Sequence, residues 1–262
     1  MLPRMASCPF VLASWPGSRR AMAAAVVVLI ATWPSVASAY RPFDGTDGDV
    51  AEFHELELEI QPVGYFRMGN AHDFVAGGVL NYGFAHGFEL VAQGFDFAPL
   101  DGATPPSRNR FTDTGVFVKT VLRQGCLQEK NGPSLATEVG PLLPTVNDAT
   151  GFGAYAGGIV STCMGDSLIV HWNVETQILR ATYDFDLFVG AILEPPPSKY
   201  VVRPVVELFV ERDFGGIQTY SGLVGAIWTV GTKLALDAAM REALIGGQNV
   251  SELRAGFTWI VP

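Results

Sequence analysis

The sequence predicts an all-β protein: a single antiparallel transmembrane β-barrel of about twelve strands, preceded by a cleaved signal peptide. Three observations lead to this prediction. Apolar and polar residues alternate over long stretches, the number of these stretches is even, and the chain begins with an export signal. Single-chain barrels of the outer membrane contain an even number of antiparallel strands, each about ten residues long.

The clearest alternation covers residues 166–179, where Val170 and Trp172 alternate with His171 and Asn173. Successive side chains of a strand point to opposite faces, so this stretch has one apolar and one polar face. It is long for a strand of a soluble sheet, and its length suits a tilted strand that crosses a bilayer.

Eleven further stretches show the same alternation with varying clarity, and it is weakest in the two glycine-rich ones. The twelve expected strands cover residues 55–61, 73–83, 86–97, 112–123, 134–143, 151–162, 166–179, 182–193, 199–211, 218–230, 232–241 and 250–261. The connections after the second, sixth and tenth strands are tight. Those after the first, third, fifth, ninth and eleventh are expected to be longer, with the longest around 98–111. Short turns on one rim and long loops on the other are typical of outer-membrane barrels.

Residues 1–39 have the pattern of a secretory signal peptide. They carry three arginines and no acid, then the apolar run 21–31 and the small residues 37–39, so cleavage is expected before Tyr40. The run is too short to span a membrane. Residues 40–51 then form a polar lead without periodicity, and 52–262 form the barrel.

Charge and cysteine content restrict the function classes. The formal net charge is −9, and removing the arginine-bearing leader makes the chain more acidic still, which argues against nucleic acid as a partner. Two cysteines remain after cleavage, Cys126 and Cys163. Export favours a disulfide between them, but two thiols 37 positions apart can also be buried or free. No cysteine pattern indicates a metal site or a cofactor.

A soluble antiparallel sandwich is the alternative fold, because its strands also alternate and it too is secreted. The length of the strands, the lack of a heavily charged outer face and the aromatic residues near strand ends favour the membrane barrel. We therefore expect a location in the bacterial outer membrane, with lipid as the surrounding partner.

Seven segments in the second half resemble those of bacterial outer-membrane barrels of the transporter-like, MetA-type phenol-degradation-pathway class. They are GPSLATEVGPLLP (132–144), GFGAYAGGIVS (151–161), VHWN (170–173), VRPVVELFVER (202–212), SGLVGAIW (221–228), LALDAAMREAL (234–244) and ELRAGFTW (252–259). The resemblance covers over half of the mature chain, and the order of the segments carries it more than any single motif. It implies an outer-membrane location and passage of small, including hydrophobic, compounds, and it supplies no catalytic residues.

The last expected strand also resembles the signal that the barrel assembly machinery reads, through Arg254, Gly256, Trp259 and Val261. Chains of this kind commonly end on an aromatic residue, whereas this one ends at Pro262. The assembly machinery is therefore an expected partner, by way of a signal that departs from the usual pattern.

If the apolar faces contact lipid, the polar faces line the lumen. The predicted lumen-lining residues are Asp113, Lys119, Arg123, Glu138, His171, Asn173, Glu175, Asp184, Asp186, Arg203, Glu207, Asp237, Arg241, Glu252 and Arg254. Charges in a low-dielectric wall must pair or be hydrated, so cross-strand charge ladders are expected. Such a lining either selects solutes in an open channel or braces a plugged barrel used as structure or adhesion surface.

A third function class is a lipid hydrolase embedded in the membrane. His171 and Asn173 invite it, with Ser161 or Ser221 as nucleophile, but neither serine lies in a known nucleophile motif. Both polar residues also face the lumen rather than the lipid. His54 with the acidic residues 55, 57 and 59 suggests a metal site, although carboxylates at this spacing more often mark a hydrated strand. We therefore predict a small-molecule channel without enzymatic activity, metal or cofactor.

Overall fold

The computed structural model describes residues 42–100, 109–197 and 199–261. The expected signal peptide and the centre of the longest loop, 101–108, lie outside the described residues. Within the described ranges, no helix has the length and hydrophobicity that crossing a membrane requires.

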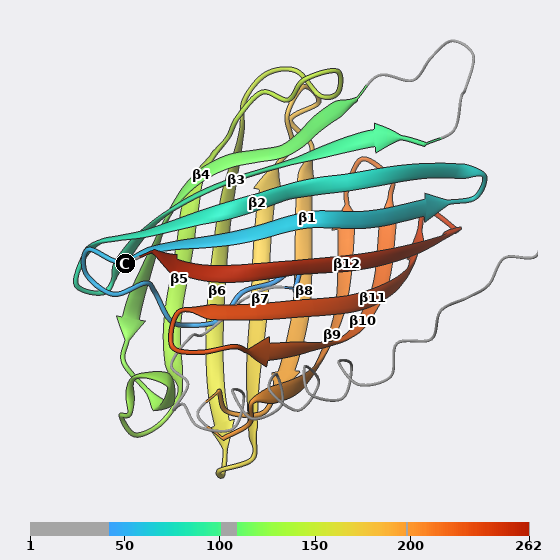
Figure 1. Ribbon diagram of the computed structural model, residues 1–262. Helices are drawn as coiled ribbons and strands as arrows, with labels where there is room; N and C mark the ends of the chain where they lie inside the picture. The colour runs from blue at the N-terminus through green and yellow to red at the C-terminus, as the bar shows by residue number, and fades with distance from the viewer. Residues whose placement is uncertain (1–41, 101–108, 198, 262) are drawn as a thin grey trace, which may run out of the picture. The chain divides into compact units, whose positions relative to one another are not determined.

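Twelve antiparallel strands form one closed barrel, in which each strand pairs with its neighbours in sequence and β1 pairs with β12 (Figure 1). The strands are β1 (Leu56–Met68), β2 (Ala71–Ala85), β3 (Phe88–Pro99), β4 (Arg110–Arg123), β5 (Ser134–Leu142), β6 (Gly153–Met164), β7 (Leu168–Ile178), β8 (Phe185–Glu194), β9 (Val202–Asp213), β10 (Gln218–Thr229), β11 (Leu234–Ile245) and β12 (Gln248–Val261). A short 3-10 helix, η1 (Cys126–Gln128), lies between β4 and β5. Closure leaves no unpaired sheet edge, which is what a strand-built membrane span requires.

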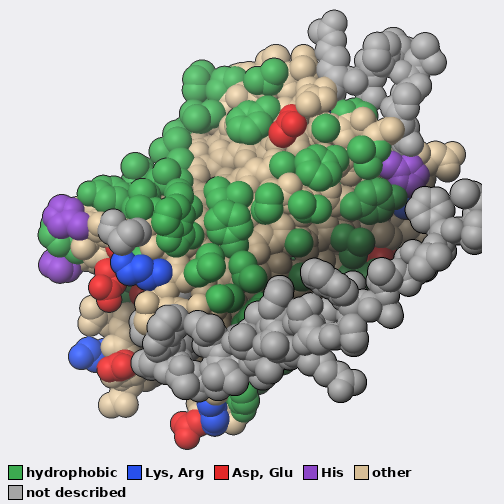
Figure 2. Space-filling model, in the orientation of Figure 1, with side chains coloured by type: hydrophobic (Ala, Val, Ile, Leu, Met, Phe, Trp, Pro, Cys, Tyr) green, Lys and Arg blue, Asp and Glu red, His purple; other side chains and the backbone are tan. Residues whose placement is uncertain are grey.

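The two faces of each strand differ in both chemistry and exposure. On β7, Trp172 is 51% exposed while His171 is 1% exposed, and on β9 Leu208 is 58% exposed while Glu207 is 1% exposed. Figure 2 shows hydrophobic side chains spread over the strands of one outer face, with most of the visible charged side chains near the strand ends. The outer surface is therefore apolar and the enclosed lumen largely polar, which identifies the fold as a transmembrane barrel rather than a soluble sandwich.

The predicted fold class and strand number are confirmed, but the expected contrast between the two rims is only partly correct. The connections after β1 and β11 are two-residue turns, at 69–70 and 246–247, where longer loops were expected. β1, β2, β11 and β12 continue farther than their alternation indicated. Gly69, Gly246 and Gly247 have positive φ angles of 60°, 55° and 84°, which glycine adopts without a steric penalty in a tight hairpin.

The barrel has two rims, which differ in the strand ends that form them. The terminal rim is formed by Leu56, Val261 and the connections after the even-numbered strands, and the opposite rim by the connections after the odd-numbered strands. The connection from β4 to β5, residues 124–133, is long although it belongs to the terminal rim. Loop length therefore does not separate the two rims, and their difference lies in what each half of the lumen contains.

Candidate functional site in the barrel lumen

Residues 42–51, called the lumenal segment below, lie inside the barrel and contact strands from several sides. Its first residues bind β11 and β12. Arg254 donates a hydrogen bond to the Pro42 carbonyl (2.8 Å) and forms a salt bridge with Asp44 (2.8 Å). Arg241 forms a second salt bridge with Asp44, at 3.4 Å. Two arginines and one carboxylate thereby hold the start of the segment against the wall.

The middle of the segment binds β9 and β7 through backbone groups. Asp44 and Gly45 donate their N–H groups to the two carboxylate oxygens of Glu207, at 2.9 and 2.7 Å. Asn173 accepts from the Thr46 N–H (3.1 Å) and donates to the Thr46 carbonyl (2.9 Å). These lumenal side chains satisfy backbone groups that have no strand partner, as burial requires.

The end of the segment binds β4, β6 and β3. Lys119 forms a salt bridge with Asp47 (3.5 Å), and the Gly48 N–H donates to Ser161 Oγ (2.9 Å). The Ala51 N–H donates to a Glu89 carboxylate oxygen. A Cβ at position 48 would lie 2.9 Å from Ser161 Oγ, so only glycine brings the backbone this close without displacement.

Apolar packing adds to these polar contacts. Phe43 packs on a cluster of three inward-facing residues, Val205, Ile227 and Ala235, which are at most 1% exposed. Phe43 is partly buried, so it contributes a part of the roughly 1.5–3 kcal/mol that full burial of a phenylalanine side chain provides. The segment is therefore anchored both by charge and by hydrophobic contact.

A chain of four buried polar residues lies next to the segment. Ser161 Oγ is 2.8 Å from His171 Nδ1, His171 Nε2 is 3.4 Å from Glu194 Oε1, and Glu194 Oε2 accepts a hydrogen bond from Arg203 at 2.9 Å. This order of groups resembles the nucleophile, base and orienting acid of a hydrolase. However, Ser161 is 0% exposed and its oxygen already accepts the Gly48 N–H, so no substrate carbonyl can approach it. The geometry supports a bracing role for these four residues.

A disulfide joins Cys126 of η1 to Cys163 of β6, with Cα atoms 6.0 Å apart. It fixes η1 beside the lumenal segment, where Gln128 Nε2 donates to the Gly48 carbonyl (3.1 Å) and to Asp49 Oδ1 (3.0 Å). The two cysteines thus position a contact of the segment in addition to closing a loop.

We expect the double substitution Cys126→Ser with Cys163→Ser to lower the free energy of unfolding by about 2–4 kcal/mol, because it releases the closed loop in the unfolded chain. Urea titration of the folded barrel in lipid vesicles measures this difference. The control repeats both titrations with a reductant, under which the native protein and the variant should unfold alike. Equal stability without reductant would contradict the prediction.

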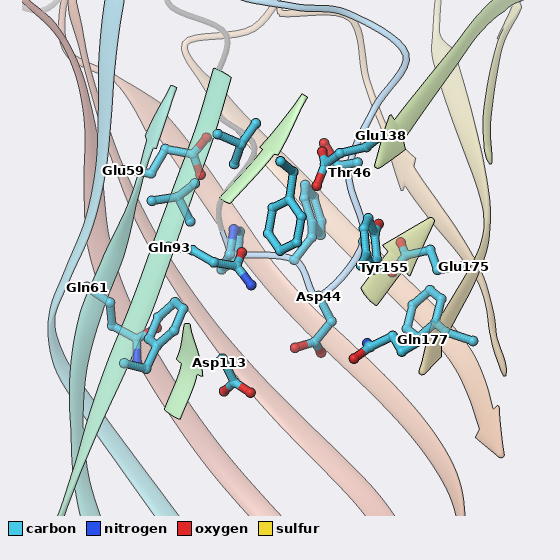
Figure 3. Close-up of a pocket in the computed structure, with 18 of the residues that line it drawn as sticks. Asp44, Thr46, Glu59, Gln61, Gln93, Asp113, Glu138, Tyr155, Glu175 and Gln177 are labelled. Atoms are coloured by element: carbon cyan, nitrogen blue, oxygen red, sulfur yellow. The ribbon is translucent and has the colours of Figure 1, made fainter. Parts of the chain in front are cut away.

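Between the lumenal segment and the opposite rim lies a cavity of about 410 Å³, called the vestibule below (Figure 3). Residues 42–46 form its floor, and Arg180 from the connection after β7 lines it at the opposite rim. Its wall combines aromatic rings with carboxylates. The half of the lumen toward the terminal rim contains the segment and the buried side chains described above.

Asp49 and Arg180 are two of the charged groups outside the strands whose pKa values are shifted. Burial, followed by the neighbouring Asp47 carboxylate, raises the pKa of Asp49. Burial therefore disfavours the ionised form of Asp49 in the docked segment. The protonated side chain stabilises the docked segment at low pH, and this stabilisation is lost as pH rises through the raised pKa. Burial lowers the pKa of Arg180, which donates two hydrogen bonds of 2.6 Å to the carbonyls of Leu143 and Thr114.

The structure brings most of the predicted lumen-lining residues together inside the barrel. Those with largely buried side chains are Lys119, Glu138, His171, Asn173, Glu175, Asp186, Arg203, Glu207, Asp237, Arg241, Glu252 and Arg254. Asp113 also lines the vestibule, at its mouth. The expected charge ladder between β11 and β12 is present, because Arg241 and Arg254 lie 3.3 and 2.9 Å from Glu252.

Two predicted residues do not lie in the lumen. Arg123 is exposed at the end of β4, beyond a shift of register against β5, and its closest partner is the Asn131 carbonyl at 3.5 Å. Asp184 precedes β8 and lies in the connection at the opposite rim. Both assignments extended the alternation past the point where regular pairing ends.

Sequence reasoning missed the lumenal segment and its partner Glu89, and it also missed Glu194, which contacts Arg203 and His171. The sequence suggests Ser161 only as a nucleophile, whereas in the structure its hydroxyl accepts the Gly48 N–H. For Glu89 the signal was available, because it alternates with the apolar residues of its strand. Glu57 and Glu59 point inward and are each 4% exposed, whereas His54 is exposed. Among the described residues, no group of His, Cys, Asp and Glu is arranged to hold a metal ion.

No protein-family model and no curated protein sequence matches this chain. Solved structures do match. The outer membrane channel from Pseudomonas putida F1 is similar with a TM-score of 0.60 and 10% sequence identity, over 84% of this chain and 100% of that one. The KdgM porin in complex with disordered oligogalacturonate is similar with a TM-score of 0.52 and 10% identity, over 79% of this chain and 99% of that one. At these identities the likeness concerns the fold, and it shows that the chain has the architecture of outer-membrane β-barrels.

Proposed function

We propose that the protein is an outer-membrane channel that lets small compounds, including hydrophobic ones, pass through the barrel lumen by diffusion. The finer assignment to the MetA-type phenol-degradation-pathway barrels is part of this proposal and rests on the seven matching segments. Outer-membrane lipid and, through the last strand, the barrel assembly machinery are its proposed partners.

The vestibule is the observation that carries the proposal. Its volume of about 410 Å³ is within the range of small-molecule pockets, and it reaches the opposite rim. A barrel that served only as a scaffold has no need of such a space in its lumen. The lumenal segment, held by side chains rather than by strand pairing, then forms the constriction that a solute must pass.

A plugged barrel with a structural or adhesive role is the second candidate, and the lumenal segment is the observation that favours it. The segment contacts β3, β4, β6, β7, β9, β11 and β12, and it crosses the half of the lumen toward the terminal rim. The two candidates differ in whether ions cross the barrel when the segment is in place.

Ion conductance of the purified protein in planar bilayers separates the two candidates, and two neighbouring glycines supply matched variants. Gly157 is buried and faces the lumen, where an added Cβ would lie 2.7 Å from the Tyr155 hydroxyl. Gly158 is exposed and an added Cβ there meets only the Val174 carbonyl, at 3.9 Å. We expect discrete current steps from the native protein, a reduction for Gly157→Trp because the indole occupies the vestibule, and no change for Gly158→Trp. A native protein that inserts and stays silent would contradict the channel and support the plug.

A further inference from the structure

We infer that the vestibule binds organic cations, specifically amines that carry an aromatic or aliphatic body. The inference deepens the proposed function, and it rests on that function for passage across the membrane but not for binding. It depends on three properties of the vestibule wall: where its carboxylates lie, which of them form no salt bridge, and what surrounds them.

The carboxylates stand in one row across neighbouring strands. Glu138 of β5 is in register with Gly157 of β6, which is in register with Glu175 of β7, and the row continues through Phe188 to Glu211 of β9. Neighbouring strands are about 4.8 Å apart, so Glu138 and Glu175 are separated by roughly 10 Å of wall. The hydroxyl of Tyr155 lies over the intervening Gly157, where an added Cβ would be 2.7 Å from it, so a ligand must approach the two carboxylates from the vestibule. Figure 3 shows Glu138, Tyr155 and Glu175 around the same cavity.

The cations near the vestibule are already engaged elsewhere. Lys119 forms a salt bridge with Asp47 and donates a hydrogen bond to Thr46, while Arg241 and Arg254 bind Asp44 and Glu252. Arg180 gives two of its donors to backbone carbonyls. None of these salt bridges includes a carboxylate of the row.

Two carboxylates of the row are desolvated and form no salt bridge among the described residues, although the charge of the nearby Lys119 acts on Glu138 from beyond contact distance. Glu138 is 8% exposed and, among the described residues, has neither a hydrogen bond nor a salt bridge, although Lys119 is its neighbour in register. Glu175 is 7% exposed and its partner is the neutral Tyr155 hydroxyl. A buried carboxylate is costly unless a positive charge or several donors compensate it, and a bound ammonium group supplies both.

Aromatic rings flank the row and select the remainder of the ligand. Phe117 and Tyr155 pack with ring centroids 5.0 Å apart, and Phe188 and Phe209 with centroids 4.7 Å apart. Faces of aromatic rings attract cations and provide apolar contact for a hydrocarbon body. A wall of this composition disfavours anions, so a polyanion such as the oligogalacturonate found with the KdgM porin is not a suitable ligand here.

Three compounds of similar shape and different charge test the inference: 2-phenylethylammonium, 2-phenylethanol and phenylacetate. Calorimetric titration into the full-length mature protein in detergent at neutral pH measures binding without requiring conductance. We expect 2-phenylethylammonium to bind at least tenfold more tightly than 2-phenylethanol, and phenylacetate not to bind. Equal binding of the ammonium and the alcohol would overturn the inference.

The double variant Glu138→Gln with Glu175→Gln keeps the shape of the wall and removes its charge. It should lose the tenfold preference for the ammonium, whereas Glu242→Gln, at an exposed position of β11, should retain it. Native-like binding by the double variant would place the ligand elsewhere and overturn the inference. Ammonium binding by a protein that conducts no ions would refute the proposed channel alone, and conductance without charge preference would refute this inference alone.

Discussion

Deletion of residues 42–51 is expected to raise single-channel conductance several-fold. The lumenal segment occupies the lumen between the vestibule and the terminal rim, and its contacts are to inward-facing side chains. The strands pair with one another and not with the segment, so the closed barrel should form without it. Planar-bilayer recordings of the deletion variant and the native protein, inserted under the same conditions, measure the effect.

Partial detachment of the segment should give an intermediate result. The variant Asp44→Asn with Asp47→Asn removes both carboxylates that hold the segment to Arg241, Arg254 and Lys119. We expect larger or noisier current steps from it than from Asp166→Asn, a single charge removal in the turn after β6. An unchanged conductance in the deletion variant, with the folded barrel verified by heat-modifiable gel migration, would show that the constriction lies elsewhere.

The substitution Arg203→Met is expected to destabilise the barrel by about 3–5 kcal/mol, the cost of leaving a buried charge without its partner. Arg203 is 0% exposed and lies 2.9 Å from Glu194, which is itself 7% exposed. Removal of the guanidinium leaves the Glu194 carboxylate with His171 as its polar neighbour. Urea titration in lipid vesicles, followed by tryptophan fluorescence, gives the change in unfolding free energy.

The double variant Arg203→Met with Glu194→Gln provides the control for this prediction. It removes both charges, so it should recover most of the stability that the single variant loses, because replacement of a buried pair is far less costly than its disruption. If the single and double variants are equally destabilised, the loss comes from packing of the long arginine side chain rather than from the unpaired carboxylate.

Much of the fold could be predicted because alternation is a local property of the chain. Trp172 and His171 differ in polarity, and this difference alone predicts that one faces lipid and the other the lumen. The same reasoning placed Lys119, Glu138 and Arg203 on the lumenal face. It failed where pairing becomes irregular: at Arg123, which follows a shift of register, and at Asp184, which lies in a connection.

The lumenal segment could not be predicted in the same way, because its position depends on contacts between residues far apart in sequence. Asp44 meets Arg254 after a separation of 210 residues, and Gly48 meets Ser161 after 113. The segment has no periodicity, and its glycines alone suggest a turn-rich linker. Its carboxylates pair with lumenal cations only in the closed barrel, because the strands that carry these cations are distant from the segment in sequence.

The pairing of β1 with β12 has a consequence for the order of biogenesis. Eleven residue pairs join these two strands, from Leu56 with Val261 to Met68 with Val250, and the lumenal segment precedes β1 by only a few residues. Because β12 is the last strand of the chain, we expect its pairing with β1 to form last. Until then, the growing sheet has an open edge at β1. We expect residues 42–51 to enter the lumen before this pairing is complete, so that the barrel contains the segment from the moment it closes.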